Sequence, residues 1–215
     1  DIPVVTRTWL KPNEDIGHYR VIRGYDKNSK ELIQDDSLQG KNIRYSYDEF
    51  NTLWQPFNYE YLIIVPENKK AIVERILENE LSDTTAWENA KTRIESELSQ
   101  NPDNWHLKFA LSRIHYYLGN YSESVNYFNN VENQLSFRTL WYQIEPLLSM
   151  YETGEYQRLL SLTENILNNQ NRAYSKAYVL RGKVFEQQGN IDAARLEYQN
   201  AVIYNSSFTS KVPNL

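Results

Sequence analysis

The sequence of 215 residues contains no cysteine. The chain therefore forms no disulfide, binds no zinc through thiolates and offers no thiol nucleophile of its own. Long apolar runs are missing too, since none approaches the roughly 20 residues that a membrane-spanning helix needs. An initiator methionine and a signal-peptide pattern are also absent, and the chain starts directly with the strand-like run "DIPVVTRTW". We interpret it as a fragment without a membrane span, and its compartment stays open.

An excess of positive charge is lacking as well. The formal net charge is −5, and acidic and basic residues are interleaved along the chain. A surface that holds nucleic acid needs a basic field, so nucleic acid is disfavoured as a partner. His106 and His115 have no neighbouring ligand at helical spacing. We expect both at the surface or in a groove, with no metal and no cofactor.

The first 66 residues have the pattern of a small antiparallel β-sheet. Turn signals separate the β-rich runs, and "DKNS" at residues 26–29 predicts a hairpin loop. Ser46 stands three residues before Glu49, which is the spacing of a capping box and predicts a short helix. The predicted strands share an enrichment in apolar and β-branched residues and lie in residues 3–9, 18–25, 30–36, 42–47 and 60–66.

This β-rich part is small for an independent domain, because a domain of this size buries only about 60% of its unfolded surface. The run "YLIIV" at residues 61–65 is apolar on both faces and so requires cover on both sides. Nothing else in residues 1–66 supplies that cover. We therefore expect an incomplete α+β unit, with a self-sufficient small β domain as the alternative.

From residue 67 the pattern becomes helical. Apolar residues at positions 72, 73, 76, 77 and 81 form an amphipathic stripe. Gly119, Gly154 and Gly189 then follow at spacings of 35 residues, each before one polar and one larger apolar residue. A fixed period near 34 is typical of a helical solenoid. We predict an all-α repeat domain at residues 67–207 with helix breaks within about two residues of each glycine, followed by a tail at 208–215.

Residues 175–207 resemble a tetratricopeptide repeat most closely. The resemblance implies that Gly182 permits close helix contact, that Ala194 and Tyr198 pack between the helices, and that Ala201 lies against the next unit. Residues 105–131 repeat the scheme, with Ser112 at the small position and corresponding residues at Leu111, Tyr121, Ser124, Phe128 and Val131.

Two further units fit the repeat less well. Residues 140–167 carry Leu159 where a small residue is expected, and Pro146 inside their first helix predicts a kink. An earlier degenerate unit has Ala90 and Ile94 in phase and ends at Pro102. The match thus spans residues 68 to about 207.

The repeat resemblance implies a concave groove lined by the first helix of each pair. Such grooves hold extended peptides or partner helices, so a protein or peptide is the expected partner. The alternative for each aromatic residue is a place in the core between repeats. The residues that the resemblance brings near the groove are Arg113, Tyr116, Trp141, Ile144, Val179 and Lys183.

The end of the array is expected to lack a cap. The tail "FTSKVPNL" is too short and polar for the capping helix that such arrays usually need. The helix at residues 190–204 would then expose Leu196, Val202 or Ile203. This predicts a partner contact or a homo-oligomer at the C-terminal end.

The β-rich part carries an ordered set of motifs. Gly-His-Tyr at residues 17–19 begins a strand that runs into Gly-Tyr-Asp, and an aspartate and then a glycine follow the hairpin. A short helix with Phe and Trp precedes the last apolar strand. Residues 3–66 thereby resemble the C-terminal half of the papain-like cysteine peptidases that cut double-glycine leaders, and of their soluble bacterial relatives.

This resemblance implies a site at His18. A cysteine nucleophile needs an imidazole to take its proton, and the imidazole needs a third group that fixes its tautomer. By resemblance His18 would be the general base and Asp36 would orient it, with Asp35 as the other candidate. Folding of the hairpin at residues 26–29 should bring His18 and Asp36 within about 2.6–3.2 Å on adjacent strands.

The chain departs from the family in two ways. Ser37 replaces the usual proline, and no segment resembles the N-terminal half that carries the nucleophilic cysteine and the oxyanion-hole glutamine. Gln39 and Gln55 are in the wrong place to substitute for that glutamine, and neither Ser37 nor Ser46 is expected to replace the nucleophile. We predict that the chain alone is inactive as a cysteine peptidase.

Two functions remain open. One is a fragment of a bacterial papain-like peptidase with attached repeats, whose full-length form would contain a Cys-bearing N-terminal half and could be exported or attached to a membrane. The other is a non-catalytic interaction scaffold whose degenerate peptidase-like part caps the repeat array.

Overall fold

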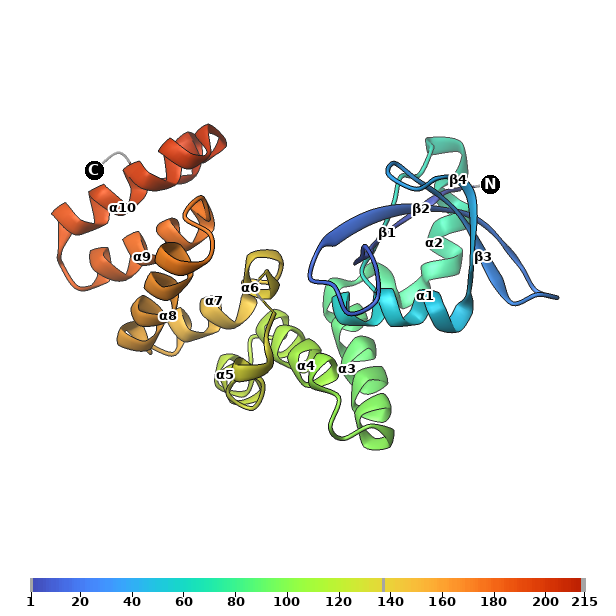
Figure 1. Ribbon diagram of the computed structural model, residues 1–215, viewed down its shortest axis with the longest axis horizontal. Helices are drawn as coiled ribbons and strands as arrows, with labels where there is room; N and C mark the ends of the chain where they lie inside the picture. The colour runs from blue at the N-terminus through green and yellow to red at the C-terminus, as the bar shows by residue number, and fades with distance from the viewer. Residues whose placement is uncertain (1, 137, 214–215) are drawn as a thin grey trace.

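The computed structural model describes residues 2–136 and 138–213. Its N-terminal part is a five-stranded antiparallel sheet with the strand order β4-β3-β2-β1-β5 (Figure 1). The predicted sheet is confirmed, although its last strand is shorter than the predicted run 60–66. The strands are β1 (Val4–Trp9), β2 (Gly17–Asp26), β3 (Glu31–Asp36), β4 (Gly40–Ser46) and β5 (Tyr61–Ile63).

Local side-chain signals begin and end these elements as predicted. In the β2–β3 hairpin, Asp26 Oδ1 accepts hydrogen bonds from the backbone N–H groups of Asn28 and Ser29. Helix α1 (Tyr47–Trp54) begins with the predicted capping box, in which Ser46 Oγ accepts from the Glu49 N–H and the Glu49 carboxylate accepts from the Ser46 N–H. Helix α1 packs against β1, β3 and β4.

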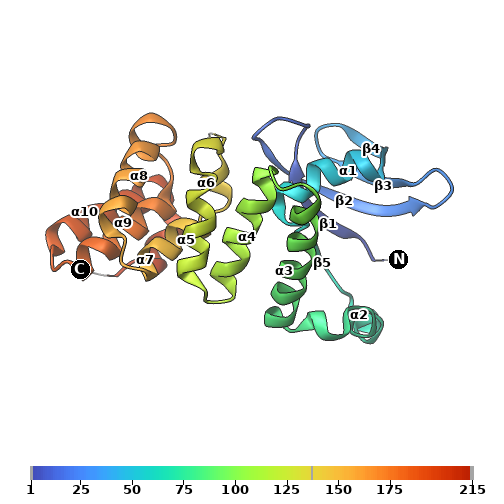
Figure 2. The ribbon, with the colours of Figure 1, turned by 90° about the horizontal axis from the view of Figure 1, so that it is seen from below.

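The segment after the sheet does not bury its apolar stripe. Helix α2 (Lys70–Leu77) packs mainly against the adjoining 3-10 turns and stands apart from the other helices (Figure 2). Among the five stripe positions only Val73 is buried, while Ile72, Ile76 and Leu81 are exposed. The periodicity correctly predicted a helix but not a core-facing one. Leu62, in β5, is likewise 60% exposed.

The remaining helices follow one another away from the sheet (Figure 2). Contacts join α3 to α4, α4 to α5, α5 to α7, α7 to α8, α8 to α9 and α9 to α10. This confirms an α+β part followed by an all-α part, with no strand after Ile63 in the described residues. The helices are α3 (Asp83–Gln100), α4 (Trp105–Tyr117), α5 (Tyr121–Asn129), α6 (Thr139–Tyr142), α7 (Glu145–Glu152), α8 (Tyr156–Asn169), α9 (Ser175–Gln187) and α10 (Ile191–Tyr204).

A glycine lies between the two helices of each of the pairs α4–α5, α7–α8 and α9–α10. Gly119, Gly154 and Gly189 have φ angles of 75°, 77° and 73°. Left-handed backbone of this kind ends a helix at low cost only at a residue without Cβ. Each preceding helix ends two residues before its glycine, and each following helix begins two residues after it. The predicted helix breaks are confirmed, whereas the repeat family itself stays a prediction.

Close packing inside the last helix pair follows the expected pattern. A Cβ placed on Gly182 would lie 2.5 Å from Cε1 of Tyr198, so α9 and α10 approach as they do only because residue 182 has no side chain. Ala194 and Ala201 are fully buried in the same region. At the corresponding place in the first pair, Ser112 Oγ donates to the carbonyl of Ser124 at 2.7 Å.

Pro146 has a different effect from the predicted kink. The expected single helix is divided into α6, which ends at Tyr142, and α7, which begins at Glu145. Pro146 lies in the first turn of α7. Proline is tolerated there because the first-turn N–H groups have no partner within the helix.

The C-terminal end is partly covered. Leu196 and Ile203 are 59% and 73% exposed, as predicted, while Val202 is half-buried. The tail contributes more than expected, because residues Ser206–Lys211 form a 3-10 helix against α10 and Val212 packs against the core. Over the residues that the structure describes, no helix is both long and apolar enough to cross a membrane.

Candidate functional site

His18 and Asp36 lie on neighbouring antiparallel strands, β2 and β3, and are joined by a hydrogen bond. His18 Nε2 lies 2.9 Å from Asp36 Oδ2. Strand pairing is in register at Val21 and Asp35, which places Asp36 beside the first residues of β2. The predicted distance is confirmed. The catalytic roles of the two residues stay a prediction.

The carboxylate of Asp36 is fixed by the backbone of the turn that follows it. Its Oδ1 accepts hydrogen bonds from the N–H groups of Leu38 at 2.7 Å and Gln39 at 2.9 Å. Burial favours the neutral carboxyl, but these two bonds and the bond with His18 outweigh it and lower the pKa of Asp36. At neutral pH an ionised Asp36 therefore accepts the Nε2 proton of His18. Nδ1 of His18 has no hydrogen-bond partner among the described residues.

Arg20 completes this network and was missed by the sequence reasoning. Its guanidinium is fully buried and its Nη1 lies 2.6 Å from Asp36 Oδ2. The same guanidinium donates to Thr8 Oγ1 at 3.0 Å and to the carbonyl of Leu10 at 2.6 Å. Side chains alternate across a strand, so a residue two positions after His18 shares its face. The spacing of two residues between His18 and Arg20 was the signal in the sequence that could have identified Arg20.

The alternative orienting residue lies on the other side of β3. Asp35 pairs with Arg23 at 3.0 Å and accepts from the Asn42 N–H at 2.9 Å, at the surface. Neighbouring residues of a strand point to opposite faces, which separates Asp35 from His18. The structure therefore places Asp36, and not Asp35, against the imidazole.

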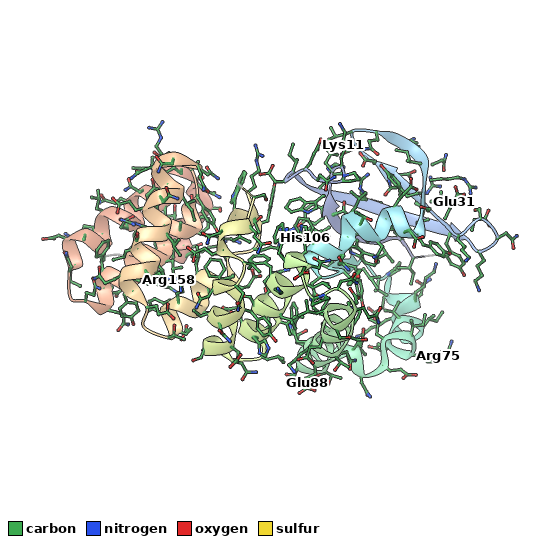
Figure 3. All side chains as sticks on the ribbon, turned by 60° about the horizontal axis from the view of Figure 1, so that its bottom comes forward. Lys11, Glu31, Arg75, Glu88, His106 and Arg158 are labelled. Carbon is green, nitrogen blue, oxygen red and sulfur yellow. The ribbon has the colours of Figure 1, made fainter. Side chains whose placement is uncertain are left out.

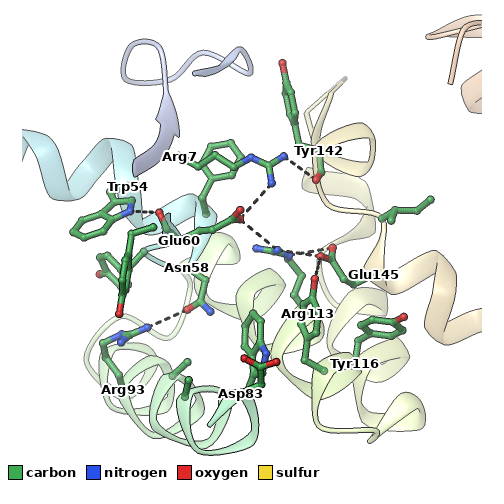
Figure 4. Close-up of a pocket in the computed structure, with 18 of the residues that line it drawn as sticks. Arg7, Trp54, Asn58, Glu60, Asp83, Arg93, Arg113, Tyr116, Tyr142 and Glu145 are labelled. Carbon is green, nitrogen blue, oxygen red and sulfur yellow. Dashed lines mark hydrogen bonds and ion pairs between the residues drawn. The ribbon is translucent and has the colours of Figure 1, made fainter. Parts of the chain in front are cut away.

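Three of the six residues expected in a groove lie together. Arg113, Tyr116 and Ile144 line a cavity of about 1040 Å³ between the sheet and the helices (Figure 4). Trp141 is exposed outside that cavity, and Val179 and Lys183 lie farther along the chain on α9. Binding of a partner by these residues stays a prediction.

Arg113, one of the six groove candidates, is already paired with a carboxylate. It is 3% exposed, and its Nε and Nη2 donate to the two carboxylate oxygens of Glu145 at 3.1 and 3.0 Å. Burial opposes both charges, but their attraction outweighs it, raising the pKa of Arg113 and lowering that of Glu145. Tyr117 also donates to Glu145, at 2.8 Å.

The two histidines of α4 are less exposed than predicted. His106, on α4, lies in the middle of the molecule (Figure 3) and stacks on Trp105 at 3.7 Å between ring centroids. Burial lowers its pKa to about 4. His115 is 6% exposed and stacks on Tyr127. No group of residues suited to holding a metal ion occurs in residues 2–136 or 138–213.

Comparison with known families supports the resemblance of the N-terminal sheet to a peptidase. Residues 1–62 match the model of the Peptidase_C39 like family. The match contains His18, Arg20 and Asp36 and ends within β5, before the helical array. A comparison with curated proteins finds no match. The N-terminal sheet is therefore peptidase-like.

Proposed function

We propose that the N-terminal sheet is the base-bearing half of a papain-like cysteine peptidase unit. His18 would be the general base and Asp36 the residue that fixes its tautomer. The observation that carries this proposal is the 2.9 Å hydrogen bond between His18 Nε2 and an Asp36 carboxylate that two backbone N–H groups already hold in place. General-base catalysis needs that pre-organisation.

The nucleophile in this proposal comes from polypeptide outside these 215 residues, because the chain contains no cysteine. Ser46 is a poor substitute, since its hydroxyl donates to the Glu49 carboxylate at 2.7 Å within the helix cap. Without a thiol no acyl-enzyme forms, and the chain alone is expected to hydrolyse no peptide. With a thiol beside Nδ1, His18 would accept its proton while Asp36 stabilises the resulting imidazolium.

We also propose that residues 67–207 are tetratricopeptide repeats that bind a protein or peptide. The support is the equal spacing of the three left-handed glycines, the close contact at Gly182 and the order in which the helix pairs meet. The bound protein or peptide would occupy the cavity between the sheet and the helices, which is lined by Arg113, Tyr116 and Ile144.

A non-catalytic scaffold is the second candidate, and one contact favours it. Gly17, directly before His18, lies so close to α6 that an added Cβ would be 3.0 Å from the ring of Tyr142. Trp9 packs edge-on against the same ring, with centroids 5.9 Å apart. The sheet thus packs on α6, within the helical array, and does not stand apart from it.

One experiment separates these functions. The chain would be produced together with any polypeptide encoded immediately ahead of it and assayed on a peptide library, beside His18→Ala and Asp36→Asn, with Asp35→Asn as the matched control. A peptidase loses hydrolysis in the first two variants and keeps it in the control. Hydrolysis that tolerates His18→Ala would contradict the assignment of the base, and a preceding polypeptide without cysteine would favour the scaffold.

A further inference from the structure

Two largely buried guanidinium groups converge on one carboxylate oxygen at the edge of the cavity. Glu60 Oε2 lies 3.3 Å from Arg7 Nη1 and 3.9 Å from Arg113 Nη2 (Figure 4). The side chains of Arg7 and Arg113 are 15% and 4% exposed, whereas that of Glu60 is 41% exposed. The carboxylate is thus the accessible member of the group.

The backbone at Glu60 is fixed independently of the two arginines. Asn58 and Tyr59 both have left-handed φ angles, 53° and 57°, which are uncommon for residues with a side chain. Trp54 Nε1 donates to the Glu60 carbonyl at 2.8 Å, and Tyr59 Oη lies 2.9 Å from the Glu97 carboxylate. Burial is the main cause that raises the pKa of Tyr59 to about 12, so its hydroxyl donates to Glu97 at neutral pH. The turn therefore stays in place if the Glu60 side chain rotates away.

Of the two arginines, Arg7 is the one whose charge Glu60 balances. Arg113 already has a bidentate partner in Glu145, while Arg7 has no carboxylate other than Glu60 within 4.0 Å among the described residues. Arg7 is otherwise held by the Tyr142 carbonyl at 2.9 Å and by the ring of Phe57, 4.9 Å below the guanidinium. Removal of the Glu60 carboxylate would leave a positively charged position on the cavity wall.

We propose that Arg7 and Arg113 form a binding site for the carboxylate of a ligand in the cavity, and that Glu60 is the internal counter-ion that occupies this site in its absence. Planar guanidinium groups match carboxylates through paired charge-assisted hydrogen bonds. The aromatic walls beside the site, including Trp54 and Tyr116, would contact the rest of the ligand. An acidic peptide side chain and a small carboxylic acid share this chemistry. The site rests on the proposed binding of a protein or peptide in this cavity and adds the chemical class of its ligand. It does not involve His18.

The test compares wild type with Glu60→Gln, which removes the resident charge and keeps its shape. The probe is a blocked peptide whose only charge is one glutamate side chain, and binding is followed by calorimetry and by the indole N–H resonance of Trp54. Glu60→Gln should bind about tenfold more tightly, because one competing charge-assisted bond is worth about 1.4 kcal/mol or more. Glu88→Gln, on the outer side of α3, is the matched control and should change nothing.

Further arms make each outcome decisive. Adding Arg7→Gln to Glu60→Gln should abolish the gain, and the glutamine form of the peptide should not show it. Acetate binding as tightly as the peptide would identify a small acid as the ligand, whereas phosphate binding equally well would contradict the carboxylate class. If Glu60→Gln fails to fold, Glu60→Asp draws the carboxylate back by one methylene and should give a smaller gain. No gain in either variant overturns the proposal.

Discussion

The sheet and the helical array bury different kinds of side chain. In the array, the largest core cluster is built from aliphatic and aromatic residues such as Leu147, Met150 and Leu159, all fully buried. In the sheet, the fully buried residues include Thr6, Thr8, Arg20 and Gln34, with Asp36 almost as deeply enclosed. Apolar packing dominates the array, which also buries the Arg113–Glu145 ion pair. Charged and polar groups organise the interior of the sheet.

This difference indicates that a larger share of the buried side chains carries a desolvation cost in the sheet than in the array. A buried polar group is destabilising unless it is hydrogen-bonded, and a buried charge is more so unless it is paired. Arg20 and Asp36 satisfy one another, but neither amide atom of Gln34 has a hydrogen-bond partner among the described residues. Polar groups kept at such a cost are expected at a site that holds an imidazole and a carboxylate in one geometry.

The largest expected effect comes from removing the buried charge of the sheet. Arg20→Met should lower the free energy of unfolding by about 3–5 kcal/mol, because it leaves Asp36 buried without its ion-pair partner. Arg23→Met, which breaks the exposed pair with Asp35, should cost no more than about 0.5 kcal/mol. Urea denaturation of both variants measures the difference. Equal and small losses would mean that charge does not organise the sheet.

The array should be most sensitive to added volume. Gly182→Ala would normally stabilise a helix by up to about 1 kcal/mol. Here the new Cβ would meet the Tyr198 ring, so we expect a net loss of about 1–3 kcal/mol in the free energy of unfolding. Gly24→Ala in β2 is the matched change, since the nearest atom is 4.0 Å from the new Cβ, and it should have little effect. A Gly182→Ala variant as stable as wild type would contradict the close contact between α9 and α10.

The pH dependence of stability should report on the buried carboxylate of the sheet. Because the folded-state pKa of Asp36 lies below its unfolded value of about 3.9, its contribution is complete above that value and is lost as pH falls through the folded pKa. Asp36→Asn should therefore flatten the acid side of the stability profile, measured by urea denaturation from neutral to acidic pH. Asp192→Asn, at a side chain that is 94% exposed, should keep the wild-type profile. An unchanged acid limb in Asp36→Asn would refute the role of this carboxylate in stability.

The smallest expected effect concerns the exposed apolar ends. Self-association through α10 should be weak and should disappear in Ile203→Glu, because a charge is costly to bury against another apolar surface. Leu62→Glu in β5 provides the comparison at the other end. Sedimentation over a range of concentrations detects both. A wild-type chain that stays monomeric at every concentration would exclude self-association at the C-terminal end. Contact with a different protein would then be the remaining explanation for the exposed side chains of α10.

Much of the local structure could be predicted from the sequence, because its causes are local or periodic. Glycines without Cβ ended helices at residues 119, 154 and 189, and the Ser46–Glu49 spacing began α1. The hairpin between β2 and β3 has a short loop, which limited the residues that could face His18. Loop length alone would pair Asp36 with Val21, and the register shift between Ile22 and Gly24 places Asp36 on the face of His18, at 2.9 Å.

The tertiary structure alone decided which charges are free and which apolar faces are covered. Arg113 meets Glu145 across 32 residues and Arg7 meets Glu60 across 53, so no local pattern indicated that either arginine was already paired. The apolar stripe of α2 has helical periodicity, yet periodicity does not state whether another element packs against it. Those outcomes depend on how distant segments approach one another, and that is fixed only when the sheet and the array are folded together.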